Sequence, residues 1–250
     1  MQDKPNFILV PDHPPERPPA SLGARLRALA APLTALLTRA SGTAPPATLS
    51  RPRLIFGFDA TASREPAWDT ARRVTDSLFA ALPGALDVAL AVHGGSRLHT
   101  FTEFTANPGA LRDRAAAISC ITGRTQLLPI LSRALSSPGV RVVIYIGDVF
   151  EESPWRGRKL ADAMGARGIR LIVLHDTADW LARRDAELFQ DLARRTGGCV
   201  LPFDANAPQR LREVLAAAAV YAVGGTALLQ QRRAELPAAA LLLRHLGRDG

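Results

Sequence analysis

The stretch LIFGFDATASRE, residues 54–65, carries a clear strand pattern and the first cluster of oxygen-bearing side chains in this chain. Leu54–Phe58 is nearly all apolar, which is typical of a short buried strand. Asp59 ends this strand, and Thr61 and Ser63 follow at alternate positions. One acid and two alcohols just past a strand offer the oxygen ligands that hard divalent cations prefer. Such residues also cap helices and form turns, so a site requires further oxygens from elsewhere in the chain.

Apolar strands alternate with amphipathic helices on the C-terminal side of this stretch, which predicts an α/β fold. A Gly-Gly-Ser turn at residues 94–96 joins the second and third strands and predicts a hairpin. We therefore expect a doubly wound, mostly parallel, Rossmann-like sheet with one antiparallel edge hairpin and helices on both faces. The predicted strands are Leu54–Phe58, Asp87–His93, Arg97–Phe104, Arg141–Ile146, Ile169–Leu174 and Cys199–Phe203. The predicted helices are Pro66–Leu82, Pro108–Ile118, one opening at Thr125, Arg158–Ala166, Ala186–Arg195 and Pro208–Val223.

Composition changes toward both ends of the chain and predicts three segments. Residues 1–52 are rich in proline and form an N-terminal extension, with a leucine stripe that predicts a helix at 21–39 and a linker after it. Residues 53–224 form the α/β domain. Residues 225–250 follow a Gly-Gly pair and form a helical tail, broken by Pro237. The fold class is thus an α/β domain with helical extensions at both termini.

The net charge of +8 raises the question of a nucleic-acid partner. The basic residues are scattered, however, and few aromatic residues lie among them, so no stacking platform is visible. Nearly all are arginine, which together with abundant alanine matches a GC-rich coding bias, and we expect a bacterial protein. Cys120 and Cys199 have no metal-type spacing and are expected as free thiols. The weakly polar run at 214–229 is short for a membrane span, so we expect a cytoplasmic protein without a transmembrane segment.

More oxygen donors are expected at the edge of the sheet where Asp59, Thr61 and Ser63 lie. Ligands of open α/β sheets bind outside the carboxyl ends of the strands. Asp148 follows the strongest strand, RVVIYI, and Thr125 opens the helix that precedes this strand. Two acids and three hydroxyls from three loops suit Mg²⁺ or Mn²⁺, with water or an incoming acid completing an octahedron.

The order of these residues resembles a von Willebrand factor A-like (VWA) domain with a metal-ion-dependent adhesion site (MIDAS). The family's Asp-x-Ser-x-Ser motif is matched by Asp59-Ala60-Thr61-Ala62-Ser63, its lone Thr by Thr125, and its last Asp by Asp148. The resemblance covers residues 53–223. The sequence departs from the family at Thr61, which replaces a serine, and at Gly147 and Val149, which flank Asp148 in place of Thr and Gly.

The resemblance implies a protein-interaction module, an adaptor or scaffold, rather than an enzyme. The metal ligands would be Asp59, Thr61, Ser63, Thr125 and Asp148, and the open coordination position would accept a carboxylate from a partner protein. Glu103, Glu151 and Glu152 are candidate rim residues, although solvated loop positions explain them better.

Two other functions stay open at this point. The first is a metal-assisted phosphoryl hydrolase: haloacid-dehalogenase-type phosphatases are similar in placing an Asp after the first strand, but they have a second Asp two residues later, where this chain has Thr61. His93 is the nearest candidate base, and a structural or solvent-facing role fits it better. An RNA-associated protein would use the scattered arginines, and its binding would weaken with salt.

Overall fold

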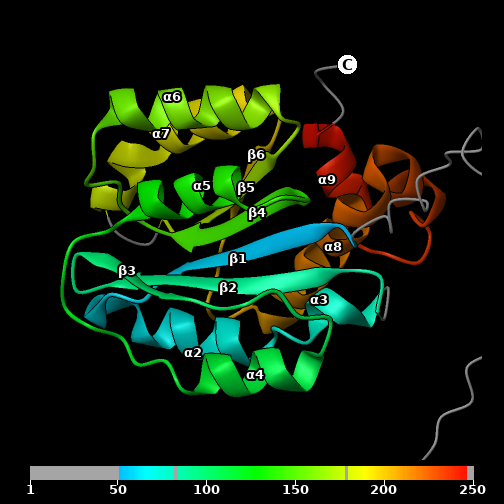
Figure 1. Cartoon of the computed structure of the whole chain (residues 1–250), viewed down its shortest axis with the longest axis horizontal. Coiled ribbons are helices and arrows are strands. Elements are labelled where there is room, and N and C mark those ends of the chain that lie inside the picture. The colour runs from blue at the N-terminus through cyan, green and yellow to red at the C-terminus, as the bar shows by residue number, and fades with distance from the viewer. Residues whose placement is uncertain (1–50, 82–83, 178–179, 247–250) are drawn as a thin grey trace, which may run out of the picture. The chain divides into compact units, whose positions relative to one another are not determined.

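A computed structural model describes residues 51–81, 84–177 and 180–246, and Figure 1 shows their arrangement. The chain divides into units 1–49 and 50–250, and the described residues belong to the second unit. The predicted N-terminal extension and its helix at 21–39 lie outside the described residues, apart from residues 51 and 52.

The described residues form a six-stranded sheet in the order β3-β2-β1-β4-β5-β6. All neighbouring strands are parallel except β2 and β3, which pair antiparallel at one edge. Gly95 and Ser96 have φ values of 60° and 62° in the turn between these two strands, as a tight two-residue hairpin requires. The fold class predicted for the domain is confirmed. The strands are β1 Arg53–Asp59, β2 Asp87–Gly94, β3 Arg97–Phe101, β4 Val140–Gly147, β5 Arg170–His175 and β6 Cys199–Pro202.

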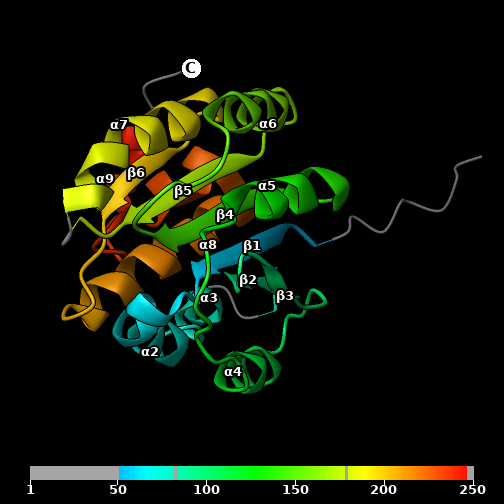
Figure 2. The ribbon, with the colours of Figure 1, turned by 90° about the vertical axis from the view of Figure 1, so that its left-hand side faces the viewer.

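The central strands are apolar on both sides because helices cover both faces of the sheet. Successive side chains of β1 alternate between two cores, with Leu54 and Phe56 in one and Ile55 in the other. Figures 1 and 2 show the helices on either side. One core packs under α5 Leu127–Ser136, α6 Pro154–Ala166 and α7 Trp180–Arg195. The other packs under α2 Glu65–Arg73, α3 Ser77–Ala80, α4 Pro108–Ala116, α8 Pro208–Gln231 and α9 Ala239–Leu246.

Several helix boundaries differ from the prediction. The helix predicted at 66–82 is two helices, α2 and α3, and Val74, where the first of them ends, has the non-helical φ of −115° and ψ of 9°. Helix α6 begins at Pro154, four residues before the predicted start, with Ser153 as its N-cap. Helix α7 begins at Trp180, six residues before the predicted start.

The glycine pair at 224–225 divides α8 into two helical segments. Gly225 has a non-helical conformation, with φ 64° and ψ −157°, and a second helical segment follows it to Gln231. Leu229 and Leu242, which lie in the predicted C-terminal helical tail, are fully buried in the same core as the first segment of α8. This segment therefore packs on the α/β domain up to Leu246, the last described residue.

Helix α8 is long and apolar enough to cross a membrane by length and composition, and no other described helix is. Half of its most apolar window is buried inside the protein. Its buried residues, which include Val214, Leu215 and Ala218, pack in the core under β1 and β4. A core helix of a globular domain has these same properties.

Candidate metal centre

The predicted ligands converge at the carboxyl ends of β1 and β4, which are neighbours at the centre of the sheet. The chain adds β2 and β3 on one side of β1, and then β4, β5 and β6 on the other. This reversal is the switch point where α/β sheets bind ligands. A cleft of about 310 Å³ opens here, lined by residues that include Thr61, Ser63, Thr125, Asp148, Glu151 and Leu181. Four of the five predicted ligands thus line one cleft.

Asp59, the fifth predicted ligand, is fully buried at the end of β1, directly behind Thr61. The Thr61 N–H donates to Asp59 Oδ1 at 3.0 Å. Asp59 Oδ2 is buried and has no hydrogen-bond partner among the described residues. Burial, followed by the negative charge of Asp148, raises the pKa of Asp59 from 3.8 to about 7. A buried carboxylate oxygen that has no hydrogen-bond partner and is affected by the charge of a second acid fits a site for a cation.

The two hydroxyls of the first motif lie next to each other. Thr61 Oγ1 and Ser63 Oγ are 3.5 Å apart where the extended residue Thr61 leads into the 3-10 turn η1 Ala62–Arg64. Thr61 is nearly buried and Ser63 is exposed. The extra methyl of Thr61, the departure seen in the sequence, is accommodated while its hydroxyl still reaches the cleft.

Thr125 and Glu151 hold each other by two reciprocal hydrogen bonds. The Thr125 N–H donates to Glu151 Oε2 at 2.8 Å, and the Glu151 N–H donates to Thr125 Oγ1 at 3.1 Å. This pair joins the loop before α5 to the loop after β4. Glu152 Oε2 accepts the N–H of Leu128 at 2.9 Å and so caps the start of α5. Glu151 therefore lies at the cleft, whereas Glu152 caps the start of α5.

Glu103 lies far from the cleft, which corrects its placement at the rim. Strand β3 runs antiparallel to β2 and ends at Phe101, so residues after it return to the amino end of β2. Thr105 pairs with Val88 there. The Glu103 carbonyl accepts a hydrogen bond from Arg114 at 2.9 Å. An antiparallel hairpin carries its second strand away from the edge where the turn lies.

Arg64 enters the site although the sequence did not single it out. Its side chain is 8% exposed, and Nη1 lies 2.6 Å from Asp176 Oδ2 and 3.8 Å from Asp148 Oδ2. Its Nε and Nη2 are buried without a hydrogen-bond partner among the described residues. A positive charge thus stands beside one candidate ligand acid. The local sequence gives no signal for this role, because an arginine after Ser63 is ordinarily solvated.

His93 is a structural residue rather than a catalytic base. It is fully buried, and its Nε2 lies 2.8 Å from the Tyr145 hydroxyl. Burial lowers the pKa of His93 to about 3, so the imidazole is neutral at neutral pH. Its Nδ1, 3.6 Å from Asp59 Oδ1, therefore makes a polar contact with the carboxyl group and not an ion pair.

The ring of Tyr145 leaves no room for a side chain at position 147, which explains why a glycine precedes Asp148. A Cβ at position 147 would lie 2.5 Å from the ring of Tyr145. We expect Gly147→Ala to lower the free energy of unfolding by about 2 kcal/mol, because the buried ring must leave its contact with His93. Chemical denaturation measures this change. Gly84→Ala is a poor control because its φ is 73°, whereas Gly109→Ala, whose Cβ would meet only the Asn107 side chain at 3.3 Å, should cost less.

The donor set consists of hydroxyls and two acids rather than an acidic cluster. No group of three or more Asp, Glu, His or Cys side chains in the described part of the chain is placed to hold a metal ion. The arrangement combines the carboxylates of Asp59 and Asp148 with the hydroxyls of Thr61, Ser63 and Thr125. Few charges and several neutral oxygens suit a hard cation that keeps some of its water.

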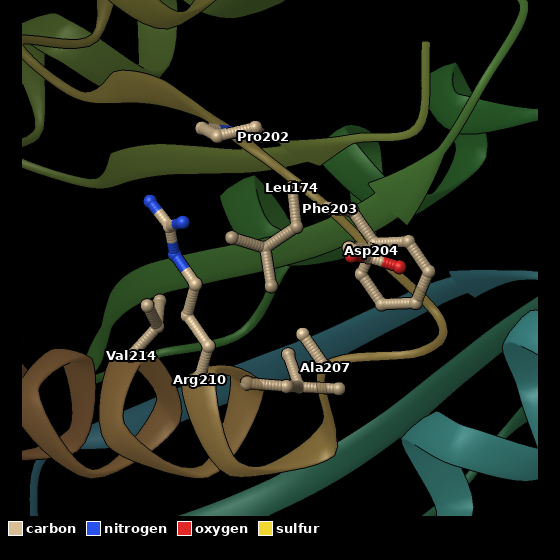
Figure 3. A pocket seen from close by; sticks show the side chains of 8 residues that line it. Leu174, Pro202, Phe203, Asp204, Ala207, Arg210 and Val214 are labelled. Carbon is tan, nitrogen blue, oxygen red and sulfur yellow. The ribbon is translucent and has the colours of Figure 1, made fainter. Parts of the chain in front are cut away.

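A second hollow lies between β5, the segment after β6 and α8 (Figure 3). Its volume is about 20 Å³, which holds about one water molecule. Leu174, Phe203 and Val214 make most of its wall apolar, and Asp204 and Arg210 lie at its sides. It offers no room for a larger ligand.

Comparisons with family models and with the sequences of curated proteins give no match. Solved structures do match. Proximal thread matrix protein 1 from the mussel byssus has a TM-score of 0.53 at 14% identity, over 67% of this chain and 45% of that chain. Its structure with a zinc-occupied MIDAS motif has a TM-score of 0.52 at 14% identity, over 68% and 46%. The VWA domain of SpRpn10 has a TM-score of 0.51 at 11% identity, over 65% and 94%.

These matches show that the described unit has the VWA-type α/β fold. This chain spans less than half of the mussel protein and nearly all of the SpRpn10 domain. At such identities the likeness concerns the fold, and the site is argued from its own residues.

Proposed function

We propose that this chain is a metal-dependent protein-interaction module that binds an acidic residue of a partner protein. Asp59, Thr61, Ser63, Thr125 and Asp148 hold Mg²⁺ or Mn²⁺ in the cleft. The observation that carries the proposal is the buried Oδ2 of Asp59, which lacks a partner among the described residues, while the negative charge of Asp148 acts on this carboxylate and three hydroxyl residues line the adjacent cleft. A bound divalent cation supplies an open coordination position that attracts a carboxylate.

The chain's own residues make the cleft selective for such a ligand. Thr61 and Ser63 supply neutral oxygens to the lining of the cleft. The reciprocal hydrogen bonds of Thr125 and Glu151 join two of its loops. A MIDAS motif is named in the mussel byssus structure, where it holds zinc. The same kind of site on the same fold supports an adaptor or scaffold role here.

Two features favour binding over catalysis and over RNA. His93, the candidate base, is fully buried and neutral, so it reaches no substrate in the cleft. Several arginines are engaged in ion pairs: Arg158, Arg194 and Arg195 all contact Asp191. They do not form a free basic stripe, which an RNA-binding face requires.

Calorimetric titration with Mg²⁺, Mn²⁺ and Zn²⁺ tests the site. We expect a single-site isotherm with the native protein for at least one of these ions and none with Asp59→Ala, because the buried carboxylate is lost. Thr61→Ser is the matched control. It keeps the hydroxyl and removes a methyl, so it should bind metal as well as the native protein or better. The proposal is contradicted if Asp59→Ala binds metal as the native protein does, or if the native protein binds none of these ions.

A further inference from the structure

Three large hydrophobic side chains are exposed in the described part of the chain: Ile121 at 37%, Trp155 at 62% and Trp180 at 69%. By contrast, Trp68 is only 2% exposed. A tryptophan ring in water leaves a large apolar surface uncovered, and such residues are enriched where proteins bind each other. The position of these three side chains therefore bears on function.

All three lie at the edge of the sheet that carries the candidate metal centre. Ile121 directly precedes Thr122 and Gly123, which line the cleft, and its N–H donates to the carbonyl of Ala60 at 2.9 Å. Trp180 directly precedes Leu181, which also lines the cleft. We call Ile121, Trp155 and Trp180 the apolar rim.

Trp155 joins the apolar rim through the packing of its helix. It lies in the first turn of α6, which follows β4, and Trp180 begins α7, which follows β5. The two helices pack side by side and both run back from the carboxyl ends of their strands (Figures 1 and 2). Their first turns therefore lie at the same edge. Lys159 Nζ stands 4.1 Å from the centre of the Trp155 ring and helps to hold this ring in place.

We propose that the acidic residue bound by this site lies in a protein segment with large aliphatic or aromatic residues on both sides of it. These flanking side chains pack on the apolar rim while the carboxylate enters the cleft. The inference rests on the proposed metal-dependent function and names the class of partner. Asp148 and Glu151 line the cleft and repel any anionic group, so the carboxylate of the segment enters only when a metal ion is bound, and binding of the segment must depend on that ion.

Three labelled peptides of equal length test the inference with the full chain by fluorescence anisotropy. The first has one Asp between two pairs of Leu, the second has Asn in place of Asp, and the third has Gly in place of every Leu. In Mn²⁺ the first peptide should bind about tenfold or more tightly than either of the others. In EDTA its binding should fall to the level of the Asn peptide.

Variants of the apolar rim separate packing from metal binding. Trp180→Ala and Trp155→Ala should each weaken binding of the Leu-flanked peptide several-fold, about threefold to tenfold. Both should leave the Mn²⁺ titration and the binding of the Gly-flanked peptide unchanged. Arg141→Ala, which removes a long exposed side chain at the amino end of β4, is the matched control and should change neither.

Each contrary result has a distinct meaning. If the Leu-flanked and Gly-flanked peptides bind equally in Mn²⁺, the apolar rim does not bind the flanking side chains. The proposed metal-dependent function is then unaffected. A native protein that binds no metal in the calorimeter removes both proposals. Binding to phosphatidylserine vesicles in EDTA that is lost in Trp180→Ala would assign the rim to a lipid surface and overturn the peptide inference.

Discussion

Asp59→Asn is expected to abolish Mn²⁺ binding and, at the same time, to make the metal-free protein more stable at pH 8. The carboxylate of Asp59 is fully buried, its Oδ2 lacks a hydrogen-bond partner among the described residues, and Asp148 repels it. Asn removes the charge and retains an acceptor for the Thr61 N–H. We expect a gain on the order of 2 kcal/mol in the free energy of unfolding in EDTA.

The gain should depend on pH in a defined direction. The pKa of Asp59 is about 7 in the folded protein, above the ordinary value of 3.8, so folding takes up a proton between these values. The unfolding free energy of the native protein therefore falls as the pH rises through this window, and the ionised group costs most above pH 7. Asp59→Asn should consequently match the native protein near pH 4 and exceed it at pH 8.

Chemical denaturation in EDTA across this pH range measures the effect. Asp113→Asn changes an exposed acid of α4 in the same way and should show no such pH-dependent gain. In saturating Mn²⁺ the order should reverse, because only the native protein gains the free energy of metal binding. A loss of stability for Asp59→Asn in EDTA at pH 8 would mean that the carboxylate is satisfied within the protein and leaves no need for a cation.

The sheet was predictable because its central strands must be apolar on both faces. Strands β1 and β4 read as uninterrupted apolar runs, and the turn at Gly95 and Ser96 identifies the hairpin. Topology then places Asp59 and Asp148 at one edge without any side-chain detail. The same reasoning, applied fully to the hairpin, would have placed Glu103 at the opposite edge.

Arg64 was not predictable from the local pattern. Arginine side chains usually lie in solvent, so nothing marks Arg64 as buried. Its partner, Asp176, is 112 residues away in the chain. Only the neighbouring positions of β1, β4 and β5 in the sheet bring Arg64, Asp148 and Asp176 together. The break between α2 and α3 at Val74 was not predictable either, because the buried side chains of Ala71, Val74 and Leu78 continue one apolar stripe across it.

Arg64→Gln is expected to tighten Mn²⁺ binding and to weaken the fold. The guanidinium lies 3.8 Å from Asp148, so it already neutralises part of the charge that would attract a metal ion. Removing one buried unit charge at this distance should improve metal affinity by about 1–2 kcal/mol, or about tenfold. Asp176 would lose its 2.6 Å contact with Arg64, and the free energy of unfolding in EDTA should fall by about 2 kcal/mol.

A double variant tests both effects of Arg64→Gln. Arg64→Gln combined with Asp176→Asn removes both members of the ion pair and should recover part of the lost stability, since the carboxylate that had paired with Arg64 is removed as well. Its Mn²⁺ affinity should lie between those of Arg64→Gln and the native protein, because Asp176→Asn also removes a nearby negative charge that attracts the cation. Arg72→Gln, at an exposed arginine paired with Asp69, is the control for charge alone and should change metal affinity little. If Arg64→Gln instead weakens Mn²⁺ binding, Arg64 orients Asp148 for the metal rather than competing with it.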